Sequence, residues 1–215
     1  VSAAVLREFA RHPLLKSRGS AAGKKLYSIY FDTPDLELYR RGIALRIRRD
    51  GARWVQTIKG GGAVHSGLHT RHEVEFEVPG PFPDCRPVGD AGFGGLFVSP
   101  GLSAGLKPVF VTDFRRVTRT VVPAPGTVIE VCLDRGEIKC GDTIEPICEV
   151  ELELKSGPVS ALFELASNLA GAGSFRAENR SKAERGYALF RGEAPAPSKS
   201  RSAGLNSGMS VNDAF

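Results

Sequence analysis

The sequence predicts an α+β fold in which an antiparallel β-sheet closes into a barrel flanked by helices. Charged and apolar residues alternate in ALRIRR (44–49), HEVEFEV (72–78) and CEVELELK (148–155), as they do in strands whose two faces differ. Strand-like segments follow one another through most of the chain, whereas helical patterns occur mainly near its two ends. Closing such a sheet would place the charged faces in a lumen and would leave no exposed strand edge.

The first half of the chain contains two helix patterns and four strand patterns. Residues 1–12 are expected to form a helix that Pro13 ends. A short helix is expected within 32–42, where Thr33 suits the N-cap, Pro34 the first helical position and Gly42 the end. The strand patterns cover residues 25–31, 44–50, 54–60 and 71–78. Asp50-Gly51 predicts a tight hairpin between the second and the third strand.

The second half continues the strands and ends with helices. Residues 79–105 are rich in glycine and proline and predict a loop with one short helix. Strands are expected in 108–122, 127–146 and 148–155, with a turn at Asp134-Arg135-Gly136. An amphipathic helix is expected before Gly171, with one apolar face made of Val159, Leu162, Phe163, Ala166 and Leu169. Ser181 and Glu184 form a capping-box pattern for a last helix over 182–190. Residues 193–215 have the composition of a linker or disordered tail, so the folded domain is expected within 1–192.

Composition narrows the function classes. The net charge of +5 and the pI of 9.2 suit a polyanionic ligand. We expect no nucleic-acid partner, because the chain has neither zinc-finger spacing nor an aromatic-rich RNA-binding signature. No run approaches the roughly 18 apolar residues of a membrane helix, so no membrane partner is expected. The four cysteines form no CxxC pair and predict reduced, packed thiols in the cytoplasm.

The charged strand faces point to phosphate chemistry. Arginine forks match phosphate oxygens in pairs and lysine supplies a point charge, and the candidate cations are Arg46, Arg48, Lys59, Arg116 and Lys182. Carboxylates beside such cations suit a hard divalent ion that bridges to phosphates. Together they predict metal-assisted phosphoryl transfer from a short polyphosphate to water. The alternatives are a solvated sheet face for the strand charges and a turn residue for Asp134.

Five segments resemble the CYTH family, the triphosphate tunnel metalloenzymes, and among these the bacterial inorganic triphosphatases, in which a helical CHAD domain often follows. The segments are YFDTPDLELYRRGIALRIRR, QTIKG, HEVEFEV, DRGEI and CEVELELKSG. The resemblance implies an eight-stranded antiparallel tunnel that hydrolyses inorganic triphosphate to pyrophosphate and phosphate with Mg²⁺ or Mn²⁺. The phosphate-binding residues that it implies are Arg46, Arg48, Lys59, Arg116 and Lys182, with Arg115 or Arg119 as alternatives to Arg116. The implied metal ligands are Asp134, Glu149 and Glu151. The implied catalytic residues are Arg116, Lys182, Glu73 and Glu75.

One family motif is absent. The E-x-E-x-K strand that the family places ahead of its first helix does not occur, so one wall of the tunnel is expected to be missing and this chain to be weak or inactive. The closing VNDAF is expected to lead toward a CHAD-like region. Two other functions stay open: a non-catalytic polyphosphate-binding module, and a thiamine triphosphatase or class IV adenylate cyclase. The sequence is compatible with a homodimer.

Overall fold

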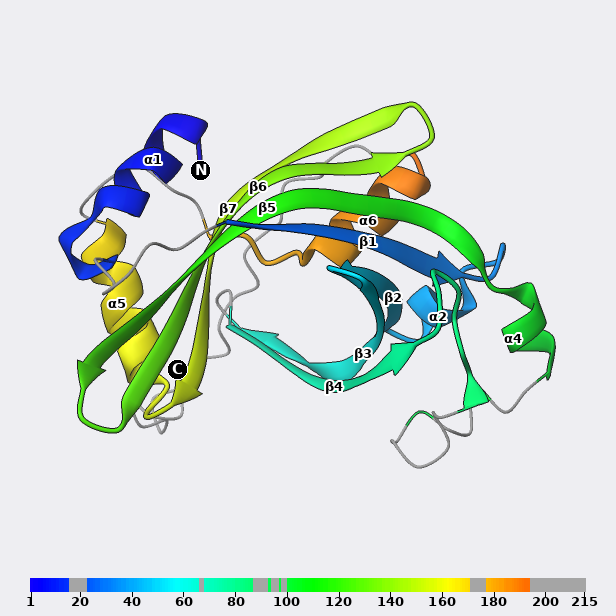
Figure 1. The fold of residues 1–215 in the computed structure, drawn as a ribbon, viewed down its shortest axis with the longest axis horizontal. Coiled ribbons are helices and arrows are strands. Elements are labelled where there is room, and N and C mark those ends of the chain that lie inside the picture. Colours follow the sequence, from blue (N-terminus) through cyan, green and yellow to red (C-terminus); the bar gives the residue numbers. More distant parts are fainter. Residues whose placement is uncertain are drawn as a thin grey trace, which may run out of the picture.

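A strongly curved antiparallel sheet forms the body of the protein. The computed structural model describes residues 1–15, 23–65, 68–86, 93, 97, 100–170 and 177–193. Seven strands lie in the order β4-β3-β2-β1-β5-β6-β7, and β2, β3 and β4 wrap round beneath β1 and β5 (Figure 1). Their bounds are β1 Lys24–Asp32, β2 Ile43–Asp50, β3 Arg53–His65, β4 Leu68–Val78, β5 Lys107–Ala124, β6 Thr127–Cys140 and β7 Thr143–Ser156. The predicted antiparallel α+β architecture is therefore confirmed.

The predicted closed barrel is not confirmed. Within the described residues, β4 and β7 are the two ends of the strand order, and the sheet is not closed by hydrogen bonds between them. The sheet is open along these two edges, although its curvature brings one face to the inside of the bend (Figure 1).

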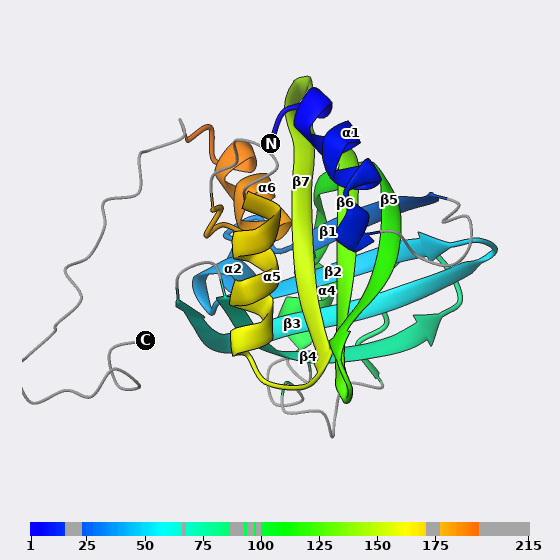
Figure 2. The same cartoon turned by 90° about the vertical axis from the view of Figure 1, so that its left-hand side faces the viewer.

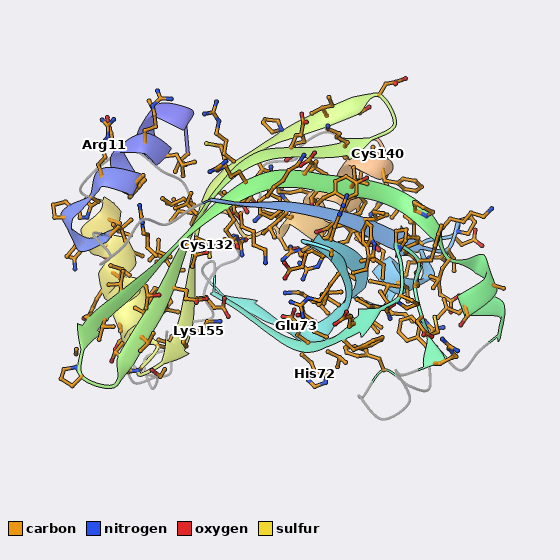
Figure 3. The ribbon with its side chains drawn as sticks, viewed as in Figure 1. Arg11, His72, Glu73, Cys132, Cys140 and Lys155 are labelled. Atoms are coloured by element: carbon orange, nitrogen blue, oxygen red, sulfur yellow. The ribbon has the colours of Figure 1, made fainter. Side chains whose placement is uncertain are left out.

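The strand register places the predicted charged residues on one face. Cross-strand partners share a face of a sheet, and Arg46 is the partner of Thr57, which is in turn the partner of Glu75. Arg116 is likewise the partner of Asp134, which is the partner of Glu149. We call this the charged face, and its predicted site residues are Arg46, Arg48, Lys59, Glu73, Glu75, Arg116, Asp134, Glu149 and Glu151. Figure 3 shows Glu73 inside the curve of the sheet and His72 outside it.

The opposite face, which we call the outer face, carries apolar residues that helices cover in two places. The helices α1 (Ala3–Arg11) and α5 (Ser160–Ala170) pack on the outer face of β6 and β7, as the turned view shows (Figure 2). The short helices α2 (Glu37–Arg40) and α4 (Pro100–Gly105) contribute to a second core on the outer face of β1, β2 and β3. None of the described helices is long and apolar enough to cross a membrane.

The last helix, α6 (Lys182–Phe190), packs on the charged face instead. Phe110 lies on that face, because its partner Tyr30 is also the partner of Arg46. A Cβ added at Gly186 would lie 2.1 Å from the Phe110 ring, so glycine is needed for this close approach. The predicted capping box at Ser181 and Glu184 is confirmed. It fixes the start of α6, where Lys182 lies, against the acidic strands.

Of three local predictions, two need correction and one is confirmed. Asp134-Arg135-Gly136 is not a turn, because β6 runs through it, and Gly136 instead allows a close approach of β5: an added Cβ would lie 2.2 Å from the Asp113 carbonyl oxygen. The helix α2 starts at Glu37 and not at Pro34, because Leu36 adopts a left-handed conformation with φ of 56°. The hairpin at Asp50-Gly51 is confirmed, with φ of 61° at the glycine.

The predicted apolar face of α5 was partly wrong. Val159 and Phe163 are each 46% exposed, and the residues buried on this helix are Ala161, Leu162, Leu165 and Leu169. The expected end of the helix at Gly171 and the predicted tail from residue 194 onward lie outside the described residues.

Candidate active site

Three carboxylates gather on β6 and β7 at the charged face. Asp134 is the register partner of Glu149, and Glu151 follows two residues later on the same face of β7. One oxygen from each of the three carboxylates lies within 4.8 Å of the others. Asp134 is fully buried, so its negative charge has to be stabilised by partners within the protein. This group of residues 134, 149 and 151 is called the acidic triad below.

Two cations from different elements neutralise the acidic triad. Arg116 on β5 donates two hydrogen bonds to Asp134, at 2.7 and 2.6 Å, and also contacts Glu151. The Lys182 ammonium lies 2.7 Å from an Asp134 oxygen and 2.8 Å from a Glu151 oxygen, and it also contacts Glu149. Because these are charge-assisted contacts at short range, the triad and the two cations form one network. Asp134 and Lys182 are buried in it, whereas the Glu151 side chain is 46% exposed.

Arg185 is a third cation at this site, and the sequence reasoning missed it. It lies on α6 one turn after Lys182 and is 7% exposed. Its guanidinium donates to Glu145 at 2.7 Å, to Glu149 at 2.6 Å and to the Pro146 carbonyl at 2.7 Å. The spacing of three residues in SKAERGY, which places Arg185 and Lys182 on one side of a helix, was the available signal. Arg185 therefore fixes one oxygen of Glu149 while Lys182 contacts the other.

The network keeps its charges over a wide pH range. Burial alone would raise the pKa of Glu151, but Lys182 and Arg116 outweigh burial and lower that pKa to about 2. Burial would likewise lower the pKa of Lys182, whereas the three carboxylates raise it above its ordinary value. Both groups are consequently ionised at neutral pH.

We expect the stability that Glu151 contributes to disappear in acid. Its folded pKa of about 2 lies below its ordinary value of 4.5, so the contribution is complete above the ordinary value and is lost as the pH falls toward 2. Urea unfolding of the unmodified chain and of Glu151→Gln, measured from pH 7 down to pH 2, should show a difference in unfolding free energy that shrinks below about pH 4.5. A difference that stays constant over this range would contradict the assignment.

A second group of charges lies on β2, β3 and β4. Arg46 donates to Thr57 at 3.0 Å, and Thr57 donates to Glu75 at 3.1 Å. Lys59 lies 2.8 Å from Glu73. Glu73 and Glu75 thus contact the basic residues of their own part of the sheet, and the described contacts do not bring them to the acidic triad.

Positive charge is incompletely matched around Arg46 and Arg48. Burial and the neighbouring Arg46 charge lower the pKa of Arg48 to about 10, and its Nε donates to the neutral Ser28 hydroxyl at 3.1 Å. The Nε of Arg46 is buried and has no hydrogen-bond partner within the described part of the chain. Buried donors are normally satisfied, so this region has spare capacity for an anion.

These features define a class of protein: an α+β protein whose curved antiparallel sheet presents paired cations and carboxylates on one face. The sequence profile of the CYTH domain matches residues 2–187. The chain belongs to the CYTH family.

Relatives agree with this assignment. The chain is 38% identical over 165 residues to the inorganic triphosphatase of Haemophilus influenzae, an alignment that covers 76% of this chain and 46% of that protein. The chain thus spans less than half the length of this curated relative.

Solved structures share the fold at low identity. The putative adenylyl cyclase HpAC1 from Hippeastrum, described as having a dominant triphosphatase activity, aligns with a TM-score of 0.57 at 17% identity, over 92% of this chain and 94% of that one. The PH1819 protein of Pyrococcus horikoshii aligns with a TM-score of 0.52 at 20% identity, over 89% and 96% of the two chains. These likenesses establish the fold.

Proposed function

We propose that the protein hydrolyses inorganic triphosphate to pyrophosphate and phosphate on the charged face of its sheet. The observation that carries the proposal is an acidic triad, with Asp134 fully buried, on the same face as two arginines, Arg46 and Arg48, whose charge is incompletely matched. The inorganic triphosphatase of Haemophilus influenzae, at 38% identity, supports the choice of substrate. Membership of the CYTH family supports the choice of reaction class.

The acidic triad fits a hard divalent cation. Its members Asp134, Glu149 and Glu151 offer one oxygen each within 4.8 Å of the others, and such cations prefer carboxylate oxygens. We propose Mg²⁺ or Mn²⁺ at these residues. Such an ion would offset phosphate charge and help to activate the attacking water.

The chain's own cations would bind and orient the substrate. Arg46 and Arg48 are held on β2 by Thr57 and Ser28, so their guanidinium groups are positioned to receive the oxygens of an anion in pairs. Lys59 would add a point charge from β3. Placing these groups before the reaction avoids reorganising them in the transition state. A closed tunnel is part of this proposal, with the free edges of β4 and β7 as the places where a further strand would pair.

A non-catalytic polyphosphate-binding function is the second candidate. It is favoured by one observation: Arg116 and Lys182 already contact the acidic triad. If these contacts persist with the ligand bound, the triad acts as a structural ion-pair network and the protein binds phosphate chains without cleaving them.

Phosphate release from tripolyphosphate, with Mg²⁺, with Mn²⁺ and with EDTA, separates the two functions. We expect metal-dependent release that falls by about 10²-fold or more in Glu149→Gln/Glu151→Gln, because charge stabilisation of several kcal/mol is lost. Glu153→Gln is the matched control, since Glu153 lies on the same face of β7, is 59% exposed and contacts Lys155. Release that is unaffected by the double substitution, or tripolyphosphate binding without release, would overturn the hydrolase proposal.

A further inference from the structure

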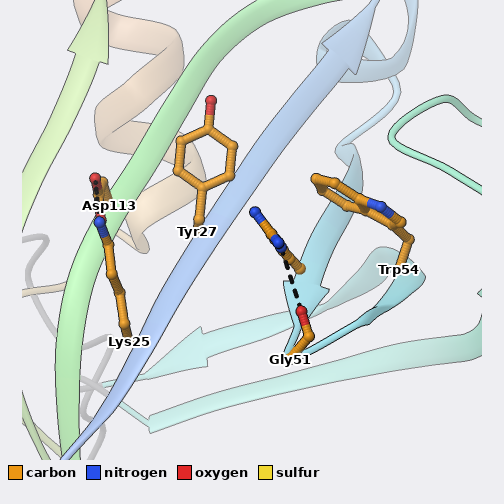
Figure 4. Close-up of a pocket in the computed structure, with 6 residues that line it drawn as sticks. Lys25, Tyr27, Gly51, Trp54 and Asp113 are labelled. Atoms are coloured by element: carbon orange, nitrogen blue, oxygen red, sulfur yellow. Dashed lines mark hydrogen bonds and ion pairs between the residues drawn. The ribbon is translucent and has the colours of Figure 1, made fainter.

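A pocket lies on the outer face of the sheet, away from the charged face. Its volume is about 460 Å³, within the range of about 300–1,000 Å³ that is usual for ligand sites. It is lined by Lys25, Tyr27, Arg49, Gly51, Trp54 and Asp113 (Figure 4). Tyr27 is the chain neighbour of Ser28, which pairs with Arg48 on the charged face, so the pocket opens on the other side of the same strands.

Aromatic rings stand at both ends of a row of three residues across β1, β2 and β3. Tyr27 is the register partner of Arg49, and Arg49 is the register partner of Trp54. The Arg49 guanidinium carbon lies 6.0 Å from the centre of the Trp54 ring. Figure 4 shows the rings of Tyr27 and Trp54 on opposite sides of the pocket. Two rings with a guanidinium between them offer stacking surfaces for a planar group.

The polar groups of the pocket suit an anion that also carries hydroxyl groups. The Arg49 Nε donates to the Gly51 carbonyl at 3.2 Å, and within the described part of the chain Arg49 makes no ion pair with a carboxylate. The Lys25 ammonium, on a side chain that is 75% exposed, lies 3.3 Å from Asp113. Arg49 and Lys25 can donate to a phosphate. Asp113 can accept from sugar hydroxyls.

We propose that this pocket binds a nucleoside monophosphate. The base stacks on Trp54 and Tyr27, the phosphate binds Arg49 and Lys25, and the ribose hydroxyls donate to Asp113. The observations favour this ligand over a free phosphate because the pocket is walled by rings, and over a plain aromatic compound because it holds two cations. The proposal is independent of the triphosphatase proposal, since it uses the opposite face of the sheet.

Trp54 is the only tryptophan of the chain, so its fluorescence reports directly on the pocket. Titration of the full chain with AMP in EDTA should change this fluorescence saturably, with a Kd of about 1 mM or below. Adenosine and inorganic phosphate, titrated separately, should each bind at least about tenfold more weakly, because each lacks one half of the contacts. Arg49→Gln keeps the tryptophan and should weaken AMP binding by about tenfold or more.

Two further variants locate the ligand. Lys24→Gln removes a charge of the same sign from the residue next to Lys25 on β1, which lies on the charged face and pairs with Asp50, and should leave the AMP affinity within about twofold. Arg48→Gln removes a cation from the charged face and should also leave it unchanged. The absence of a saturable signal overturns the proposal. The proposal is also overturned if Arg49→Gln binds AMP as tightly as the unmodified chain does. The Tyr27–Arg49–Trp54 row would then only stabilise the sheet. If Arg48→Gln weakens AMP binding and Arg49→Gln does not, the AMP binds on the charged face and the proposal is overturned.

Discussion

Replacing Asp134 by asparagine is expected to lower the free energy of unfolding by about 3–5 kcal/mol, the usual cost of removing one partner of a buried ion pair. Asp134 is fully buried, accepts two hydrogen bonds from Arg116 and lies 2.7 Å from Lys182. The neutral amide would offer one acceptor in place of two charged oxygens. Both cations would then stay partly buried with less opposing charge.

Urea unfolding at neutral pH measures this change, and Glu73→Gln is its control. Glu73 also makes an ion pair on the charged face, with Lys59 at 2.8 Å, but the two side chains are 40% and 36% exposed. Solvent screens such a pair, so the control should change the unfolding free energy by less than about 1 kcal/mol. Equal effects of the two substitutions would show that burial of Asp134 does not make its pairing more important than a surface contact.

Alternation of charged and apolar residues predicted the strands and their faces well. In 44–49, 72–78 and 148–155 the charged residues spaced two apart, beginning at Arg46, Glu73 and Glu149, had to share a side, because a shift by one residue would exchange the two faces. The register confirms this. Arg46 and Glu75 are both partners of Thr57, so all three lie on the charged face, and Glu149 lies there as the partner of Asp134. Residue order alone therefore predicted which of these side chains share a face of the sheet.

Features that depend on distant contacts were not predictable in the same way. Asp134-Arg135-Gly136 has the composition of a turn, yet the glycine is there because β5 passes too close for a side chain. Arg185 has an ordinary place in a helix pattern, and its role follows only from where α6 packs. That packing depends on Gly186 and Phe110, which are 76 residues apart in the chain. Closure of the sheet is equally non-local, and the predicted barrel is not confirmed by the hydrogen-bonded strand order.

Replacing Lys182 by methionine is expected to have opposite effects on metal binding and on activity. The Lys182 ammonium contacts all three carboxylates of the acidic triad, so a divalent cation has to compete with it for their oxygens. Methionine keeps much of the side-chain volume and removes that competitor. The affinity of the triad for Mn²⁺ should rise by about tenfold or more, since one unit of opposing positive charge is gone.

Triphosphatase activity of Lys182→Met should instead fall by about 10²-fold, because a cation proposed to stabilise phosphate oxygens is absent when the reaction occurs. Mn²⁺ titration by calorimetry and phosphate release, each on the same preparation, test the two halves separately. Arg185→Met is the comparison: Arg185 holds Glu149 in place through a 2.6 Å contact, and losing an orienting partner of a metal ligand should lower metal affinity by about 10–100-fold. Two cations on one turn of α6 would thus act in opposite directions, Lys182 as a competitor of the metal and Arg185 as a support for its ligand. Equal losses of Mn²⁺ affinity in both variants would contradict this division and leave both side chains as supports of the triad.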